Sequence, residues 1–469
     1  MDVLYDIVVT INTYLSNYVL IILLVAMGLV FTIRTKFVQI RFFGEGMRRV
    51  FGEFNLFGGK KKSGISSFQA LATAVAAQVG TGNIVGACGA ILIGGPGAIF
   101  WMWLIAFLGM ATNYAEAVLA QKTREVDEDG TVHGGPVYYI TKAFTGAGGK
   151  FLAAFFAVSI ILALGFMGCM VQSNSIAATC NTAFGIPTWV MGLLIVFFAG
   201  LVFLGGVQRL ASVTEKLVPI MAVIYLIGGL VILILNIQNL PGAFALIFQC
   251  AFNPQAEVGG VTFGIIAAIS QGAKRGLFSN EAGMGSTPHA HALADVKDPH
   301  HQGTVAMIGV FIDTFVVVTM TALVVISVLY VGGPLSVDAT GLAEGIDKTN
   351  MAQLAFGSFF GSTFGNSFVA ICLLMFAFST ILSWNLFAKL NVEYLFGRFG
   401  KMPVKIFSVV ALVFIFLGSL LSNDLVWELA DMFNQLMVIP NAIALFALSG
   451  VVTTVVKQHH HGEKVELDK

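Results

Sequence analysis

The segment Ala76-Ala77-Gln78-Val79-Gly80-Thr81-Gly82-Asn83 puts two glycines and two amide side chains in the middle of an apolar stretch, residues 66–93. Both amides are costly against lipid, and both glycines permit backbone conformations that a helix interior does not use. An unwound turn here would expose carbonyl groups that hold a cation and N–H groups that hold a carboxylate. We interpret the segment as a binding site; the alternative is a close helix crossing built on small residues.

The composition of the whole chain agrees with a membrane location for this segment. Of 469 residues, 57% are hydrophobic and 11% are charged, against about 25% charged in a typical soluble domain. Several apolar stretches reach the length of a membrane helix. The net charge of zero gives no indication of a nucleic-acid partner. We therefore predict an all-α polytopic membrane protein, with the lipid bilayer as its surroundings.

The apolar stretches predict about 11 transmembrane helices. They lie at residues 16–33, 66–93, 95–121, 150–178, 186–204, 212–236, 259–274, 303–331, 365–396, 404–422 and 425–456. The first stands apart, and the other ten divide into two groups of five. The predicted units are an extra N-terminal helix with a basic loop (1–65), a first five-helix repeat (66–240), a second five-helix repeat (241–456) and a tail (457–469).

The positions of the basic residues predict the orientation in a plasma (inner) membrane. The loop after the first helix is rich in lysine and arginine, so we place it in the cytoplasm. Alternating from there puts every basic residue except Lys348 on the cytoplasmic side, including Lys274 and Arg275. The N-terminus is then outside and the C-terminus is cytoplasmic.

A second interruption is predicted in the seventh apolar stretch, within Ser270–Gly285 and centred on Ser270–Gly276. Each interruption falls in the first helix of its five-helix group, and these two helices cross the membrane in opposite directions. Interrupted helices at corresponding positions are typical of inverted-repeat transporters. At this second break we expect Gly272 to bring the backbone close to the substrate.

Three longer motifs carry a family resemblance: Gly94–Gly109, Arg275–Ser286, and His133-Gly134-Gly135-Pro136 followed by Tyr138-Tyr139. They resemble the motifs of the alanine or glycine:cation symporter family, to which the sodium:alanine symporters belong, and the resemblance runs over roughly residues 15–455. It implies a leucine-transporter-like fold of five plus five inverted helices with one extra helix in front. It also implies sodium-driven uptake of alanine or glycine, although some relatives carry glutamine and neighbouring families couple to protons.

The ninth apolar stretch contains a polar segment, Phe378–Trp384. The adjacent hydroxyls of Ser379 and Thr380 suit sodium, and the resemblance implies that they join backbone carbonyls of the first broken helix. Ser383 and Trp384 share a helical face with Thr380, so Trp384 would limit the pocket to a small side chain. The alternative is that the hydroxyls bond to carbonyls of their own helix and that Trp384 lies at the membrane interface.

Together, the polar segments and the resemblance assign two sets of residues. The predicted substrate-binding residues are Gln78, Gly80, Thr81, Gly82, Asn83, Gln172, Gly272, Thr380, Ser383 and Trp384. The predicted sodium ligands are Ala76, Val79, Ser379 and Thr380. For Gln78 the alternative is a hydrogen bond between helices. No cofactor other than the coupling sodium ion is expected.

Charged and metal-ligating residues elsewhere leave alternatives open. Asp313 and Glu116 lie within apolar stretches, where an ionisable group is a functional hypothesis; each would serve as a proton site, as a cation ligand, or in a salt bridge with Arg209, Lys274 or Arg275. The histidines of residues 289–301 and of the tail favour ordinary cytoplasmic segments over a metal site.

The sequence thus predicts a sodium-coupled importer of alanine or glycine, with a glutamine or proton-coupled carrier as the alternative. A channel lacks its symmetric filter, and an enzyme lacks a nucleophile–base pair.

Overall fold

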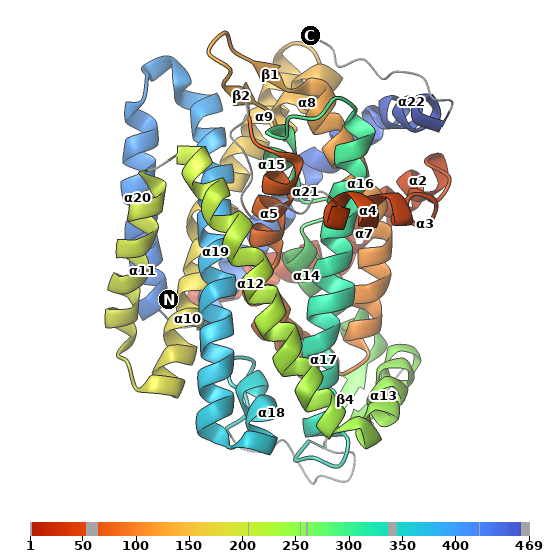
Figure 1. The fold of residues 1–469 in the computed structure, drawn as a ribbon, viewed down its shortest axis with the longest axis vertical. Helices are drawn as coiled ribbons and strands as arrows, with labels where there is room; N and C mark the ends of the chain where they lie inside the picture. The colour runs from red at the N-terminus through yellow and green to blue at the C-terminus, as the bar shows by residue number, and fades with distance from the viewer. Residues whose placement is uncertain are drawn as a thin grey trace.

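The computed structural model describes residues 2–52, 64–204, 206–253, 255–258, 261–335, 345–421 and 423–460. These residues form a bundle of long helices that run side by side, with two short hairpins (Figure 1). Eight of the described helices are long and apolar enough to cross a membrane, or nine if the bent pair Ser67–Gln78 and Gly82–Gly94 counts as one span. The protein is therefore an integral multi-pass membrane protein.

The helices of the first half, with η marking π-helical or 3-10 segments, are α1 (Asp2–Tyr14), η1 (Leu15–Leu20), α2 (Ile21–Arg34), α3 (Val38–Arg41), α4 (Phe43–Gly52), α5 (Ser67–Gln78), η2 (Gly82–Gly86), α6 (Ala87–Gly94), α7 (Ala98–Thr123), α8 (Pro136–Ala143), α9 (Ala147–Ile160), η3 (Ile161–Gly168), α10 (Cys169–Phe184), α11 (Thr188–Phe203) and α12 (Gly206–Leu235). Those of the second half are η4 (Ile237–Asn239), α13 (Leu240–Phe252), α14 (Ile265–Asn280), α15 (Pro288–Ala292), α16 (Pro299–Val310), η5 (Phe311–Val318), α17 (Thr319–Val325), η6 (Ile326–Tyr330), α18 (Met351–Phe360), α19 (Ser362–Phe396), η7 (Gly397–Phe399), α20 (Met402–Leu420), α21 (Asn423–Ala447) and α22 (Ser449–His460).

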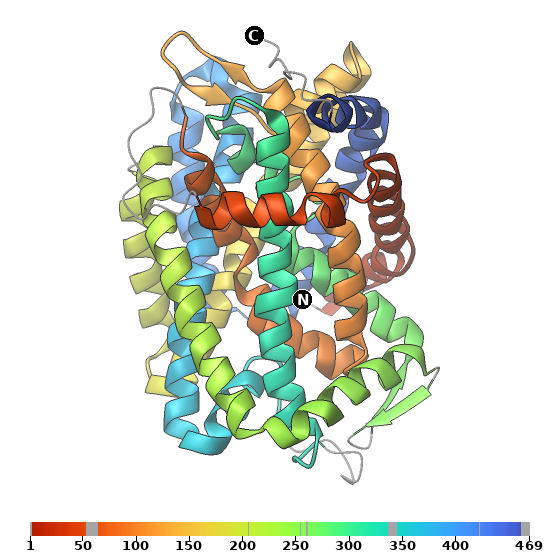
Figure 2. The same cartoon turned by 45° about the vertical axis from the view of Figure 1, so that its right-hand side comes forward.

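The predicted spans coincide with helices, with differences at the ends. Two spans, α11 and α14, have only 16 residues each, short of the ~20 that a full crossing needs. The last predicted span, 425–456, divides at Leu448 into α21 and α22, and α22 lies across the end of the bundle (Figures 1 and 2). The membrane-spanning helix α21 therefore ends at Ala447, and the more polar α22 is a separate helix.

The hairpins are both antiparallel and two-stranded. In the first, β1 (Glu125–Val126) pairs with β2 (Val132–His133). In the second, β3 (Gln255–Val258) pairs with β4 (Val261–Gly264). The predicted helix over 259–274 therefore starts later, at Ile265, because extended Gly264 ends the hairpin directly before α14; residues 259–260 lie outside the described part.

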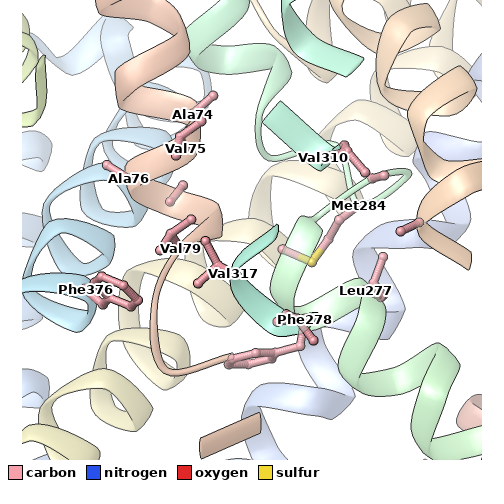
Figure 3. Packing of buried hydrophobic residues seen from close by; sticks show 14 of the residues in the cluster. Ala74, Val75, Ala76, Val79, Leu277, Phe278, Met284, Val310, Val317 and Phe376 are labelled. Atoms are coloured by element: carbon pink, nitrogen blue, oxygen red, sulfur yellow. The ribbon is translucent and has the colours of Figure 1, made fainter. Parts of the chain in front are cut away.

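The first predicted break is present. A capping box starts α5: the Ser66 hydroxyl accepts from the Gln69 N–H and the Gln69 side chain accepts from the Ser66 N–H. The helix ends at Gln78, the ribbon leaves its helical path after Val79 (Figure 3), and the chain resumes as η2 and α6 at a 48° bend. Helix α5 packs mainly against α12, α16 and α19. Val79, Phe278 and Val317 surround the break (Figure 3), so it lies inside the core.

The second break lies about ten residues later than predicted. Ser270–Gly276 is regular helix within α14, which ends at Asn280. Glu281 then takes a left-handed conformation (φ 58°), and the chain stays non-helical until α15. Gly272 lies in regular helix and not at the break, and a Cβ at this glycine would lie 2.5 Å from the Trp101 Cβ of α7. Gly272 thus serves the close packing of two helices instead of a break.

The structure also corrects the charge count behind the predicted orientation. Lys274 and Arg275 are not loop residues but buried members of α14. Asp431 of α21 pairs with both, at 2.8 Å from Lys274 Nζ and 3.1 Å from the Arg275 guanidinium, and Glu428 lies 3.5 Å from Lys274 Nζ. Buried charge of one sign is tolerated in a membrane bundle when a partner of the other sign meets it.

Candidate functional site

The first break exposes backbone N–H groups that two amide side chains satisfy. The Gly80 N–H donates to Asn83 Oδ1 at 2.9 Å, and the Thr81 N–H donates to Gln172 Oε1 of α10 at 3.0 Å. These N–H groups do not bond the carbonyls one turn earlier, because the α5 helix has ended. Three of the residues predicted for substrate, Gln172, Thr81 and Asn83, are therefore brought together, although they lie up to 91 positions apart.

Two hydroxyls of α19 face the carbonyl end of α5. Thr380 Oγ1 lies 2.9 Å from the Ala76 carbonyl oxygen and 3.4 Å from that of Val79. Ser379 Oγ lies 3.4 Å from the Ala76 carbonyl oxygen. Both hydroxyls also reach the carbonyl of Phe376 in their own helix, at 2.8 and 3.1 Å. The alternative that the hydroxyls bond a carbonyl of their own helix is therefore confirmed, and the sodium site stays a prediction. The neutral oxygens of these residues form a donor set that fits a sodium ion.

Glycine at position 80 is required for α19 to lie this close to the first break. A Cβ at Gly80 would lie 2.4 Å from Thr380 Oγ1 and 3.1 Å from Gln172 Oε1. Gly82 has the same role toward the other broken helix, since its Cβ would meet the Ser279 Cα at 3.0 Å. The two glycines thus let α19 and α14 close onto the first break from two sides.

A buried carboxylate lies beside the break. Asp313, in the π-helical segment η5, accepts from Asn83 Nδ2 at 2.5 Å and from the Ser279 hydroxyl at 2.9 and 3.0 Å. Thr314 adds a further hydroxyl at 2.7 Å. The sequence singled out Asp313 but not Ser279 or Thr314, whose roles depend on the packing of η5 against α14. The salt bridges proposed for Asp313 do not form with Lys274 or Arg275, which bond Asp431 instead.

The second break is held by two further carboxylates. The N–H groups of Gly283 and Gly285 each donate to Glu116 of α7 at 3.0 Å, and Asn441 of α21 donates to the same carboxylate at 2.7 Å. Glu281 accepts from Trp384 Nε1 at 2.5 Å and from the Ser286 hydroxyl. Glu116 and Glu281 therefore act as acceptors where the regular helical hydrogen bonds of α14 have ended; within the turn the Met284 N–H bonds the Glu281 carbonyl.

Trp384 is 1% exposed, so the membrane-interface alternative for it was wrong. Its ring meets Phe278 of α14 edge-on at 5.6 Å. A Cβ at Gly168 would lie within 2.4 Å of the indole, so the ring is closely enclosed. Trp384 thus connects α19 to the second break through both its ring and its N–H.

Several buried polar atoms near the first break have no hydrogen-bond partner among the described residues. They are Thr81 Oγ1, Gln172 Nε2, Ser383 Oγ and Gln78 Oε1. Gln78 Nε2, by contrast, donates to the Asn280 carbonyl at 2.7 Å, so the predicted helix–helix alternative holds for that atom. Buried polar groups are nearly always paired in native proteins, so these four atoms are exceptions that call for an explanation.

Comparison with known proteins identifies the family. All 469 residues match the sodium:alanine symporter family. The chain is 40% identical to the sodium/alanine symporter AgcS of Methanococcus maripaludis over 97% of each protein, and 38% identical to the probable sodium/glutamine symporter GlnT of Bacillus subtilis over 100% of this chain and 93% of that one. The crystal structure of MhsT in complex with L-phenylalanine is similar in fold, with a TM-score of 0.55 at 16% identity, over 85% of this chain and 90% of that one. The chain has a leucine-transporter-like fold and belongs to the sodium:alanine symporter family.

Proposed function

We propose that the protein imports alanine or glycine together with sodium by alternating access. The observation that carries the proposal is the meeting of the Ala76 and Val79 carbonyls with the Ser379 and Thr380 hydroxyls. Oxygens without full charge suit a monovalent ion that must be released again. Sodium at this point would tie α19 to the first broken helix, so that ion binding and the conformation of the break depend on each other.

The substrate would bind beside this sodium ion. In our proposal the N–H groups of Gly80, Thr81 and Gly82 meet the amino-acid carboxylate, because the N-terminal end of a half-helix favours negative charge. Gln172 releases the Thr81 N–H as the carboxylate arrives, and Ser383 offers its unpaired hydroxyl. Trp384 and Phe278 would enclose the side chain and leave room for a small one.

The driving force is sufficient for concentrative uptake. One sodium ion crossing ~100 mV releases about 2.3 kcal/mol, and a tenfold sodium gradient adds about 1.4 kcal/mol. One-to-one coupling then supports a substrate gradient of roughly 400-fold. The direction of import follows from the inward sodium gradient and the membrane potential. We propose that the N-terminus lies outside the inner membrane and the C-terminus in the cytoplasm. The units 66–240 and 241–456 would be the two repeats that move against each other.

Uptake of labelled alanine into proteoliposomes tests the proposal. We expect an inward sodium gradient to give accumulation that potassium or proton gradients do not match. Excess glycine should compete, and excess glutamine should compete less. Accumulation driven equally well by a proton gradient would contradict sodium coupling and favour a role for Asp313 as a proton site, while stronger competition by glutamine would favour a carrier of the kind that GlnT is named for.

A variant pair tests the site separately from the function. Asn83→Ala removes the acceptor for the Gly80 N–H and the donor to Asp313. Asn12→Ala removes an amide of α1 that bonds Glu428, remote in sequence from both breaks. We expect the first variant to lose uptake and the second to keep it. Full uptake by Asn83→Ala would leave the family function intact but would contradict the site.

A further inference from the structure

Three segments far apart in the sequence meet where α22 crosses the end of the bundle. They are α4, the start of α16 and the last turn of α22, and α4 lies across α16 there (Figure 2). Each contributes a metal-ligating side chain: Glu45, His300 and His459 respectively. The sequence interpretation treated these histidines as separate solvated segments, because their approach depends on the packing of α22.

The three side chains present their ligand atoms to one another. The Nε2 atoms of His300 and His459 each lie 3.7 Å from Glu45 Oε2, and the three atoms all lie within 4.8 Å of one another. A separation of 3.7 Å is too long for a hydrogen bond. It is close to the ~3.3 Å between two ligands of a tetrahedral zinc ion whose bonds are about 2.0–2.1 Å long.

The other ring nitrogen of each histidine has a partner. His459 Nδ1 lies 3.1 Å from Asp298 Oδ2, and His300 Nδ1 lies 2.7 Å from the hydroxyl of Tyr114. When Nδ1 carries the proton, Nε2 has its lone pair free for a metal, and a carboxylate behind a histidine is the arrangement that orients metal-binding imidazoles. His300 is fully buried, and its Nε2 has no hydrogen-bond partner among the residues that the structure describes.

We propose that Glu45, His300 and His459 bind a divalent transition-metal ion of the zinc type, with water completing its coordination. Arg49 bonds only Oε1 of Glu45, which leaves Oε2 for the metal. The two imidazole rings are stacked with centroids 3.7 Å apart. Because a metal lies in the plane of each ring that binds it, one ring has to tilt; His459, 23% exposed in the last turn of α22, is the one free to do so.

The site would tie the C-terminal helix α22 to α4 and α16. It is a different site from the sodium ligands, which lie on α5 and α19, and it rests on different residues from the proposed transport function. Its ligands are nitrogen and carboxylate donors, which zinc prefers and sodium does not.

Zinc titration of the full-length purified protein, in competition with a chromophoric chelator, tests the proposal. We expect one zinc ion per chain, and visible absorption bands of a tetrahedral ion when cobalt replaces zinc. Glu45→Gln and His459→Ala should each weaken zinc binding by about 100-fold or more, since loss of an outer partner alone costs 10- to 100-fold. Asp298→Asn, which keeps an oxygen to cap α16, should weaken it by about 10- to 100-fold.

The matched control replaces the two tail histidines that follow, His460→Ala with His461→Ala, and should leave zinc binding unchanged. Glu45 and His459 are partly exposed, so their variants are expected to fold, and elution as a single species checks this. If the tail double variant loses zinc while Glu45→Gln and His300→Ala keep it, the tail alone holds the metal and the proposal is overturned. Failure of alanine uptake in the unmodified protein would not affect this result.

Discussion

The two broken helices occupy corresponding places in the two halves but treat their free backbone groups differently. At the first break, N–H groups are met by neutral amides, and four polar side-chain atoms around it lack partners among the described residues. At the second break, the carboxylates of Glu116 and Glu281 accept from backbone, hydroxyl and indole donors. The first break has unused hydrogen-bonding capacity, whereas the second has little.

This difference suggests different roles. Neutral amides bond weakly enough to be exchanged for a ligand, because a net hydrogen bond between neutral groups contributes about 1 kcal/mol. Hydrogen bonds to charged groups contribute about 1.5–3 kcal/mol each, and several of them hold the second break. We therefore expect changes at the first break to affect transport, and changes at the second to affect stability.

The largest effect should come from Glu116→Ala at the second break. The variant leaves the N–H groups of Gly283 and Gly285 without their acceptor and removes one of the two acceptors of the Asn441 amide, which keeps the Gly283 carbonyl. Each unpaired buried donor costs about 1–3 kcal/mol, so we expect a loss of at least about 2 kcal/mol. Thermal unfolding of the purified protein measures it. Glu116→Gln keeps one acceptor oxygen and should lose less, so equal losses would contradict the assigned role.

Thr380→Val should have the next largest effect, and it should fall on sodium. The variant keeps the shape of the side chain but removes the hydroxyl that faces the Ala76 and Val79 carbonyls. Loss of an oxygen that contacts a cation costs about 1.5–3 kcal/mol, or about 10- to 150-fold in apparent sodium affinity. The sodium dependence of alanine uptake measures this loss. Thr380→Ser should restore the affinity, and a Thr380→Val variant with unaltered sodium dependence would remove Thr380 from the ion site.

The contrast also explains which parts of the structure could be predicted. The first break was predicted because its signal is local: glycines and amides adjoin within an apolar stretch. In the second half the glycines of Ser270–Gly276 predicted the wrong position for the break. Gly272 packs against Trp101, and the break begins at a charged residue, Glu281. Pro288, at the start of α15, was a usable signal for the resumed helix.

Contacts across the bundle could not be predicted in the same way. Lys274 and Arg275 were counted as basic residues on the cytoplasmic side because their partner, Asp431, is more than 150 positions away. Ser279 and Thr314 were missed because a hydroxyl in an apolar stretch is ordinary until a carboxylate faces it. These contacts were missed because they depend on burial and on partners far away in the sequence, which the residue types alone do not indicate.

Gln172→Ala should have a moderate effect, and it should fall on the apparent affinity for alanine and not on that for sodium. The variant removes the amide that accepts from the Thr81 N–H. If the unpaired Nε2 of Gln172 donates to the substrate carboxylate, its loss should weaken apparent alanine affinity by about tenfold, the equivalent of one hydrogen bond, with the sodium affinity little changed. Asn174→Ala, which removes an amide of the same helix that bonds the end of α20, is the matched control and should keep alanine affinity. An equal loss in both variants would indicate general damage to α10.

The smallest effect, and the finest test of the comparison, is expected from Ser383→Ala. The Ser383 hydroxyl is buried without a hydrogen-bond partner among the described residues, and burying an unpaired hydroxyl costs about 1–3 kcal/mol. Removing it should therefore raise the thermal stability of the substrate-free protein slightly, while weakening alanine binding a few-fold, because the hydroxyl is paired only when substrate is present. Ser408→Ala, whose hydroxyl already bonds the Val404 carbonyl, should change neither quantity. Unchanged alanine binding in Ser383→Ala would mean that this unpaired atom does not serve the substrate, and would weaken the inference that unused hydrogen-bonding capacity marks the first break as the exchangeable one.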